Sequence, residues 1–291
     1  MNLSQVTSSR RTDRPLRTLV YGNAGVGKST LGSKAPSPVF LCGEDGVSHL
    51  DVQRFPTPET WADVLGAIDA LTKEEHGFKT LVIDTIDWLE PLCWAHVCQQ
   101  NGKQSIEDFG WNKGYVAAVD AWRLFLRRLE TLQAKRGMHV ILLGHAVARD
   151  HKDPELDSWK RWTPKLHQAA ADLICEWCDA VLYATHQAFA KKDGPKVRGV
   201  STGERVLHTE WTAGHVAKNR HGFPPMIPLA WEELWARSRG PAALLAEIDA
   251  LLPHLPEDKR ERARAARDEA TTDPRALLGV LTRIKTTLHS N

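Results

Sequence analysis

The segment from Gly22 to Ser29 constrains this chain more than any other part of its sequence. It reads GNAGVGKS and fills every fixed position of the pattern G-x-x-x-x-G-K-[ST]. Glycines let the backbone wrap around an anion with its N–H groups pointing inward, and a following helix adds its positive N-terminal end. The pattern predicts a site for a nucleoside triphosphate, in which Lys28 neutralises the β- and γ-phosphates and Ser29 ligates Mg²⁺. The residues predicted to contact the nucleotide are Gly22, Asn23, Ala24, Gly25, Val26, Gly27, Lys28, Ser29 and Thr30.

Strands and helices alternate on both sides of this loop. Short apolar runs predict strands at 16–21, 38–42, 80–83 and 139–143, and helical periodicity predicts helices from about 28 and over 59–75, 88–100 and 115–135. Continuous apolar strands separated by helices are typical of a mainly parallel sheet that helices cover on both faces. The sequence therefore predicts an α/β fold whose first strand leads into the Gly22–Ser29 loop.

The chain divides into three regions by composition and pattern. Residues 1–15 are rich in arginine and have no apolar run, which predicts a flexible basic arm. Residues 16–238 carry the alternating strands and helices, with a long polar loop expected at 144–164 and short antiparallel strands at 206–210 and 214–217. Helical patterns at 231–237, 241–252, 256–270 and 274–288, several opening on proline, predict a break at 238–240 and a helical tail at 241–291.

Two acidic residues are candidates for the chemistry of the phosphate site. Asp84 ends a buried apolar strand, from which its carboxylate is expected to hold Mg²⁺ through water. The alternative is that Asp84 caps the helix beginning at Ile86. A hydrolase also needs a carboxylate to orient water, and Thr85 occupies the position directly after Asp84. Glu44, which follows the second strand, is the predicted substitute, against the alternative of an ordinary loop acid.

Composition excludes several classes of protein. The 38 Lys and Arg residues against 36 Asp and Glu give a net charge of only +2, so the chain is not a polybasic nucleic-acid binder as a whole. No apolar run approaches the ~18 residues of a membrane span, so we expect no membrane association. Five cysteines, an odd number, predict free thiols and a cytoplasmic location. Cys175 and Cys178 form a C-x-x-C pair, for which buried thiols are favoured over a zinc site.

These residues resemble the RecA core. The resemblance rests on the Gly22–Ser29 loop, the 40–51 segment with Glu44, the 81–85 strand, and His145 at the end of a further apolar strand. The spacing is most similar to the bacteriophage ATP-binding proteins with a bare RecA core, known as single-strand annealing proteins or recombinases. The segments that carry this similarity are 78–84, 107–110, 113–115 and 164–167, within a match over about 15–235. It implies Mg²⁺-dependent ATP hydrolysis together with binding and annealing of single-stranded DNA during phage recombination, in the bacterial host cytoplasm.

The same resemblance suggests roles for three more residues. His145 stands where RecA-like proteins place a glutamine that senses the γ-phosphate, although a strand-end histidine also fits this position. Lys218 and Arg220 resemble the Lys-Asn-Lys segment of RecA, whose cations reach the γ-phosphate of a neighbouring subunit. That role implies a homo-oligomer, either a filament or a ring. The alternative for these two cations is a solvated basic hairpin.

A DNA surface is expected beside the phosphate site. The polar 144–164 segment follows the apolar strand at 139–143, and its aromatic and basic side chains could stack on bases and bind phosphates: Arg149, Lys152, Trp159, Lys160, Arg161 and Trp162. The alternative is a lid whose tryptophans pack against the core. Lys103 and Lys113, with Trp111 between them, are candidates for a second DNA loop. The implied partners are single-stranded DNA, further copies of the chain, and a single-strand binding protein.

Two other function classes remain open from the sequence. One is an AAA-type ATPase such as a helicase loader, which the C-terminal helices favour and Thr85 opposes. The other is a non-hydrolysing switch that binds ATP to present its tail to a partner. Replacing Glu44 separates an enzyme from a switch, because only an enzyme has turnover to lose.

Overall fold

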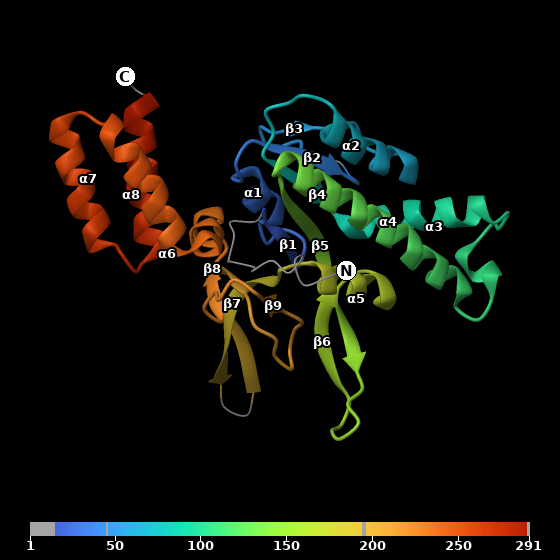
Figure 1. The fold of residues 1–291 in the computed structure, drawn as a ribbon. Coiled ribbons are helices and arrows are strands. Elements are labelled where there is room, and N and C mark those ends of the chain that lie inside the picture. Colours follow the sequence, from blue (N-terminus) through green and yellow to red (C-terminus); the bar gives the residue numbers. More distant parts are fainter. Residues whose placement is uncertain (1–14, 45, 194–195, 290–291) are drawn as a thin grey trace, which may run out of the picture. The chain divides into compact units, whose positions relative to one another are not determined.

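The computed structural model describes residues 15–44, 46–193 and 196–289, with only the backbone described at 189–200, 236–240 and 289 (Figure 1). Apart from Pro15, the predicted basic arm lies outside the described residues. The chain forms two compact units, of which the larger spans Leu16–Leu234 and the smaller contains the C-terminal helices from Trp235 onward. Among the described residues, no helix combines the length and the apolar composition that a membrane crossing needs.

A parallel sheet forms the centre of the larger unit. Its strands are β1 (Arg17–Gly22), β2 (Pro38–Cys42), β4 (Thr80–Asp84), the first part of β5 (His139–His151) and the first part of β7 (Ala180–Asp193). The order along the sheet is β10-β8-β7-β1-β5-β4-β2-β3, where β3 is Gln53–Arg54. β1 therefore lies between β5 and β7, with Gly22 opposite His145 on one side and Ala184 on the other. The predicted α/β fold is confirmed.

Helices cover both faces of this sheet. One face packs against α2 (Trp61–Lys73), α3 (Ile86–Gln100), α4 (Lys113–Arg136) and α5 (Gln168–Trp177). Trp61 and Trp122 meet edge to face at the centre of this core, with ring centroids 5.0 Å apart. α1 (Lys28–Ser33) lies on the other face, where an added Cβ at Gly32 would be 2.9 Å from Val82 Cγ1. The helix that follows the phosphate loop is thus packed closely on the sheet.

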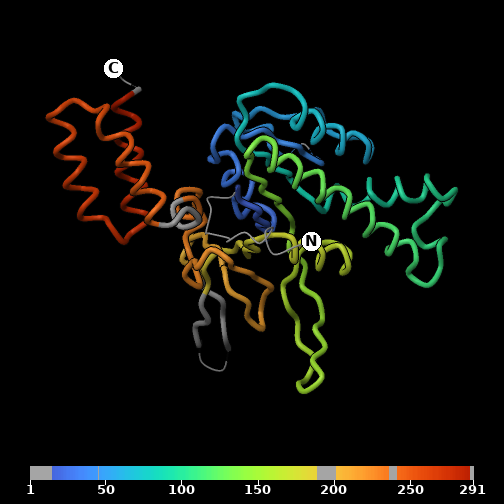
Figure 2. The backbone as a smooth tube through the Cα atoms, in the orientation of Figure 1, coloured from blue at the N-terminus to red at the C-terminus, as the bar shows by residue number. Residues whose placement is uncertain are grey.

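The predicted long loop at 144–164 is wrong. β5 continues past His145 to His151 and returns as β6 (Trp159–Pro164), so this segment is an antiparallel hairpin with Arg149 opposite Arg161. The hairpin extends away from the helical layer (Figure 2). A two-stranded ribbon exposed to solvent has no buried face, so its sequence lacks the alternation of apolar and polar residues by which strands are recognised.

Further antiparallel strands extend the sheet beyond β7. β8 (Lys196–His208) pairs with β7, and β10 (Met226–Pro228) pairs with β8. β9 (Lys218–Asn219) pairs with β7 at its amino end. The strand predicted at 206–210 is the last part of β8, whereas 214–217 forms only isolated bridges.

The smaller unit is helical. It contains the end of α6 (Trp231–Leu251), η3 (Leu252–His254), α7 (Glu257–Glu269) and α8 (Pro274–His289). Leu244 and Ile248 of α6 pack against Leu277 and Ile284 of α8. The predicted break at 238–240 is absent, because α6 continues through Pro241 and belongs to both units. A proline inside a helix removes one hydrogen bond, and here the helix continues into the segment that buries Leu244 and Ile248.

Candidate functional site

A cavity of about 300 Å³ opens at the carboxyl edge of the parallel sheet. The loops after β1, β2, β4 and the parallel part of β5 meet there, because parallel strands end at the same edge of a sheet. The lining residues are Ala24, Gly25, Gly27, Lys28, Ser29, Thr30, Glu44, Gly46, His49, Asp84, Thr85, His145 and Arg205. The predicted phosphate loop therefore forms one wall of the cavity, and the predicted acids form part of the other.

The phosphate loop depends on glycine for two different reasons. Gly25 and Gly27 have φ angles of 77° and 102°, a left-handed backbone that other residues rarely adopt. Gly22 has an ordinary backbone, but a Cβ added to it would lie 2.2 Å from the carbonyl oxygen of Ala184 on β7. Turn geometry thus fixes two of the glycines, and the close approach of a neighbouring strand fixes the third.

Lys28 is buried, with 5% of its surface exposed, although it carries a charge. Its Nζ donates hydrogen bonds to the carbonyl oxygens of Gly22 and Asn23, at 3.0 and 3.1 Å. Burial lowers the pKa of Lys28, and the charges of Asp84, Asp87 and Glu44 oppose that shift. The ammonium group is therefore held at the cavity wall in a cluster of carboxylates.

Asp84 and Ser29 form a pair of oxygen donors beside Lys28. The Ser29 hydroxyl donates to the Asp84 carboxylate, and burial raises the pKa of Asp84 against this hydrogen bond and the Lys28 charge. Asp84 Oδ2 is buried and has no hydrogen-bond partner among the described residues. A hydroxyl and a carboxylate with a free oxygen suit Mg²⁺, which takes one or two protein oxygens and completes its shell with phosphates and water. The residues present therefore fit Mg²⁺.

The capping alternative for Asp84 does not hold, because the N-cap of α3 is Thr85. Glu44 follows the end of β2 and lines the same cavity, half-buried. The structure thus brings Lys28, Ser29, Glu44 and Asp84 together, as the sequence predicts. The catalytic role of each stays a prediction.

His145 also lines the cavity, and α3 holds it in place. Its backbone N–H and its Nδ1 each lie 2.9 Å from a carboxylate oxygen of Asp87. Burial by itself would raise the pKa of Asp87, but the hydrogen bonds from His145 lower it below its usual value. From the sequence, Asp87 is only an acid in the first turn of a helix. Its contact with His145 depends on the pairing of β4 with β5, which no local pattern signals.

Comparison with known proteins identifies the larger unit. A family model described as an AAA domain (AAA_24) matches residues 14–221. The chain belongs to this AAA domain family. With the phosphate loop and the carboxylates around it, the match makes Leu16–Leu234 a P-loop ATPase core.

Two individual proteins are similar to the chain. It is 26% identical over 216 residues to the SPbeta prophage-derived uncharacterized protein YorG of Bacillus subtilis (strain 168), a match that covers 70% of this chain and 59% of that protein. The chain thus spans less than two thirds of the length of this relative. A solved structure described as "Crystal structure of the RadB recombinase" has 16% sequence identity and a TM-score of 0.40, and the match covers 72% of this chain and 84% of that one.

Arg205 is a residue of the AAA domain site that the sequence did not reveal. It stands on β8 and lines the cavity, and a Cβ added to Gly27 would lie 2.6 Å from its Nη1. The guanidinium group therefore lies over the phosphate loop. Nothing in the sequence relates Arg205 to Gly27, because only the pairing of β8 with β7, and of β7 with β1, brings the two together.

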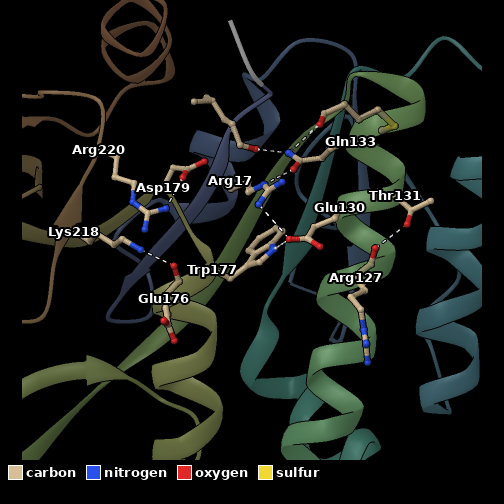
Figure 3. A network of polar contacts seen from close by, with 12 residues as sticks. Arg17, Arg127, Glu130, Thr131, Gln133, Glu176, Trp177, Asp179, Lys218 and Arg220 are labelled. Carbon is tan, nitrogen blue, oxygen red and sulfur yellow. Dashed lines mark hydrogen bonds and ion pairs between the residues drawn. The ribbon is translucent and has the colours of Figure 1, made fainter. Parts of the chain in front are cut away.

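Lys218 and Arg220 do not reach the cavity of their own AAA domain (Figure 3). Lys218 Nζ donates to the carbonyl oxygens of Cys175 and Glu176 at the end of α5, at 3.0 and 2.6 Å. Arg220 forms an ion pair of 3.0 Å with Asp179. β9 pairs with the amino end of β7, whereas the phosphate loop lies beside the other end of its parallel part. Their predicted action on a neighbouring subunit stays a prediction.

The residues predicted to bind DNA differ in how exposed they are. Arg149 donates to the Leu166 carbonyl and to Gln168 Oε1, and Trp159 Nε1 donates to the Ala213 carbonyl at 2.7 Å. The ring of Trp162 stacks near Tyr183, and Arg161 lies over the Trp211 ring. These contacts are those of the lid alternative. The exposed members of the set are Lys152, Lys160, Lys103 and Lys113, with Trp111 exposed to 97%.

The cysteines form no metal site among the described residues. All five have free thiols, and Cys178 is fully buried on the C-terminal side of α5. Burial raises the pKa of Cys175 to about 12. Thiols of this kind stay protonated near neutral pH, and zinc binds the thiolate.

Proposed function

We propose that this chain is a Mg²⁺-dependent ATPase that binds single-stranded DNA and promotes its annealing in homologous recombination. The observation that carries the ATPase part is the convergence of Lys28, the Ser29–Asp84 pair and Glu44 on one cavity at the edge of a parallel sheet. Phosphoryl transfer is catalysed mainly by positioning and charge stabilisation, which these groups can supply.

Each residue of the cavity has a separate task in this proposal. Lys28 binds the β- and γ-phosphates, and Ser29 and Asp84 hold Mg²⁺, which supplies positive charge to the polyphosphate when it is bound. Glu44 orients the attacking water and accepts its proton. His145, fixed by Asp87, responds to the γ-phosphate.

The DNA part rests on the surface next to this cavity. β5 runs from His145 directly into the β5–β6 hairpin, on which Lys152 and Lys160 are exposed. Lys103, Lys113 and the exposed ring of Trp111 offer a second combination of cations with an aromatic side chain. Cations that bind phosphates and aromatic rings that stack on bases are the usual means of binding single strands.

A homo-oligomer, a filament or a ring, belongs to the same proposal. In it, Lys218 and Arg220 would exchange their contacts with α5 and Asp179 for the γ-phosphate of a neighbour. A single-strand binding protein is a further proposed partner, and the prophage origin of the relative YorG supports a role in a phage.

ATP hydrolysis with and without single-stranded DNA tests the proposal. We expect stimulation by single-stranded DNA and not by duplex DNA, no activity in Lys28→Ala, and retained ATP binding without turnover in Glu44→Gln. Joint replacement of Lys152 and Lys160 by alanine should weaken DNA binding and lower the slope of log K against log salt by about 1.4, or about 0.7 for each phosphate contact. An unchanged slope would refute the hairpin as the DNA surface.

A second candidate function follows from the family match. An AAA-type ATPase such as a helicase loader would hydrolyse ATP with a response to a partner protein in place of DNA. Hydrolysis that is indifferent to DNA favours this candidate. ATP binding without hydrolysis in the wild-type protein favours a switch.

A further inference from the structure

Arg205 occupies a position that neither the motif nor the family match assigns. Its Nη1 lies within 2.6 Å of the point where a Cβ of Gly27 would stand, and Gly27 is the residue directly before Lys28. The inference drawn from this contact rests on the proposed function, because it concerns the same nucleotide cavity.

A β-bulge places Arg205 there. The register of β7 and β8 shifts between His186, opposite Arg205, and Ala188, opposite Ser201. Hydroxyl groups order the extra residues of β8: Ser201 Oγ and Thr202 Oγ1 each donate to the Gln187 carbonyl and accept from the backbone N–H two residues on. Bulges change the direction of a side chain relative to the regular strand, and they are common beside functional sites.

The strand is also held directly after the bulge. The backbone N–H of Leu229 donates to the Arg205 carbonyl at 2.9 Å, and the next residues of β8 pair with β10. The backbone of Arg205 is therefore fixed on both sides, between the bulge and β10. Its guanidinium group, in contrast, makes no ion pair with a carboxylate within the described ranges.

The charge of the cavity needs this arginine. Among the described lining residues are two carboxylates, Glu44 and Asp84, and two permanent cations, Lys28 and Arg205. Without Arg205, the carboxylates would outnumber these cations around a polyphosphate anion. Guanidinium groups suit phosphates because their planar fork can donate two parallel hydrogen bonds.

We propose that Arg205 is a phosphate-binding residue supplied in cis from β8, in addition to Lys28. The ligand class is the polyphosphate of a nucleoside triphosphate. Each subunit then carries two cations for its own nucleotide, and the site does not depend on Lys218 or Arg220 of a neighbour to gain its second cation.

Calorimetric titration with the Mg²⁺ complex of a non-hydrolysable ATP analogue tests this proposal. We expect Arg205→Ala to bind about tenfold to a hundredfold more weakly than wild type, the range for loss of a charge-assisted hydrogen bond. Arg205→Lys, which keeps the charge and loses the fork, should recover part of the affinity. Arg123→Ala, which removes an exposed arginine from α4, is the matched control and should bind as wild type does.

A mixing experiment separates action in cis from action in trans. Subunits carrying Lys28→Ala keep an intact Arg205, so an arginine acting in trans would restore ATP hydrolysis when they are mixed with Arg205→Ala subunits. We expect no recovery, and recovery would overturn the proposal.

The binding results also separate this inference from the proposed function. If wild type binds the analogue and Arg205→Ala binds it equally well, the inference fails while the proposed function stands. If wild type binds no nucleotide, both fail. A thermal melt of each variant identifies any loss of binding that arises from unfolding, and in that case Arg205→Lys decides.

Discussion

Replacing Gly22 by alanine tests the closest backbone approach at the phosphate site. An added Cβ would lie 2.2 Å from the Ala184 carbonyl oxygen and 3.0 Å from the Ala184 Cβ. Ordinary contact begins near 3.4 Å, so β1 and β7 would have to part by about 1 Å at this point. The obstacle is backbone on a paired central strand, which cannot rotate away as a side chain can.

The expected loss of stability follows from this overlap. Overpacking of a well-packed interior costs about 1–3 kcal/mol. For a unit of this size, each kcal/mol lowers the melting temperature by about 2–4 °C, so Gly22→Ala should melt about 2–12 °C below wild type. Differential scanning calorimetry of the full chain measures the shift.

Gly66→Ala is the matched control. Gly66 lies inside α2 with nothing within 4 Å of an added Cβ, so alanine should raise stability by about 0.5–1 kcal/mol through helix propensity. The two substitutions therefore have opposite expected signs. A Gly22→Ala protein that melts at or above the wild-type temperature would refute the reasoning.

Buried groups carry three further predictions. Burial raises the pKa of Glu90 to about 7, so its contribution to stability is lost as the pH rises from about 4.5 to about 7; Glu90→Gln should flatten this dependence in urea unfolding at about pH 5 and about pH 8. Lys218→Met removes two hydrogen bonds to the end of α5 and should lower the free energy of unfolding by about 1 kcal/mol, measured by urea titration; an unchanged midpoint would contradict this contribution. Cys175 and Cys178 should resist iodoacetamide in the native protein and react after denaturation, as read by mass spectrometry; rapid native labelling would contradict their burial.

Local signals in the sequence were sufficient for the phosphate site. The Gly22–Ser29 pattern defines its own turn, because glycine conformation and the start of a helix are set within a few residues. Asp84 and Glu44 could be placed beside it because each comes at or just after the end of an apolar strand, and parallel strands end at one edge. The α/β fold followed from the same alternation of strands and helices.

Signals over short distances were not sufficient for the antiparallel parts. The β5–β6 hairpin lacks a buried face, so its polar residues had the pattern of a loop. The helix break predicted before Pro241 is absent, because local proline preference does not decide a helix whose later turns are buried.

The sequence by itself determined which residues form the phosphate loop and which acids stand beside it, since those depend on local turns and on strand ends. Only the tertiary structure decided which cations reach the cavity. Lys218 and Arg220 lie at the amino end of β7, and Arg205 lies over Gly27, because strand pairing and a bulge bring together residues far apart in the chain. Such contacts are set by the register between strands, which no local pattern encodes.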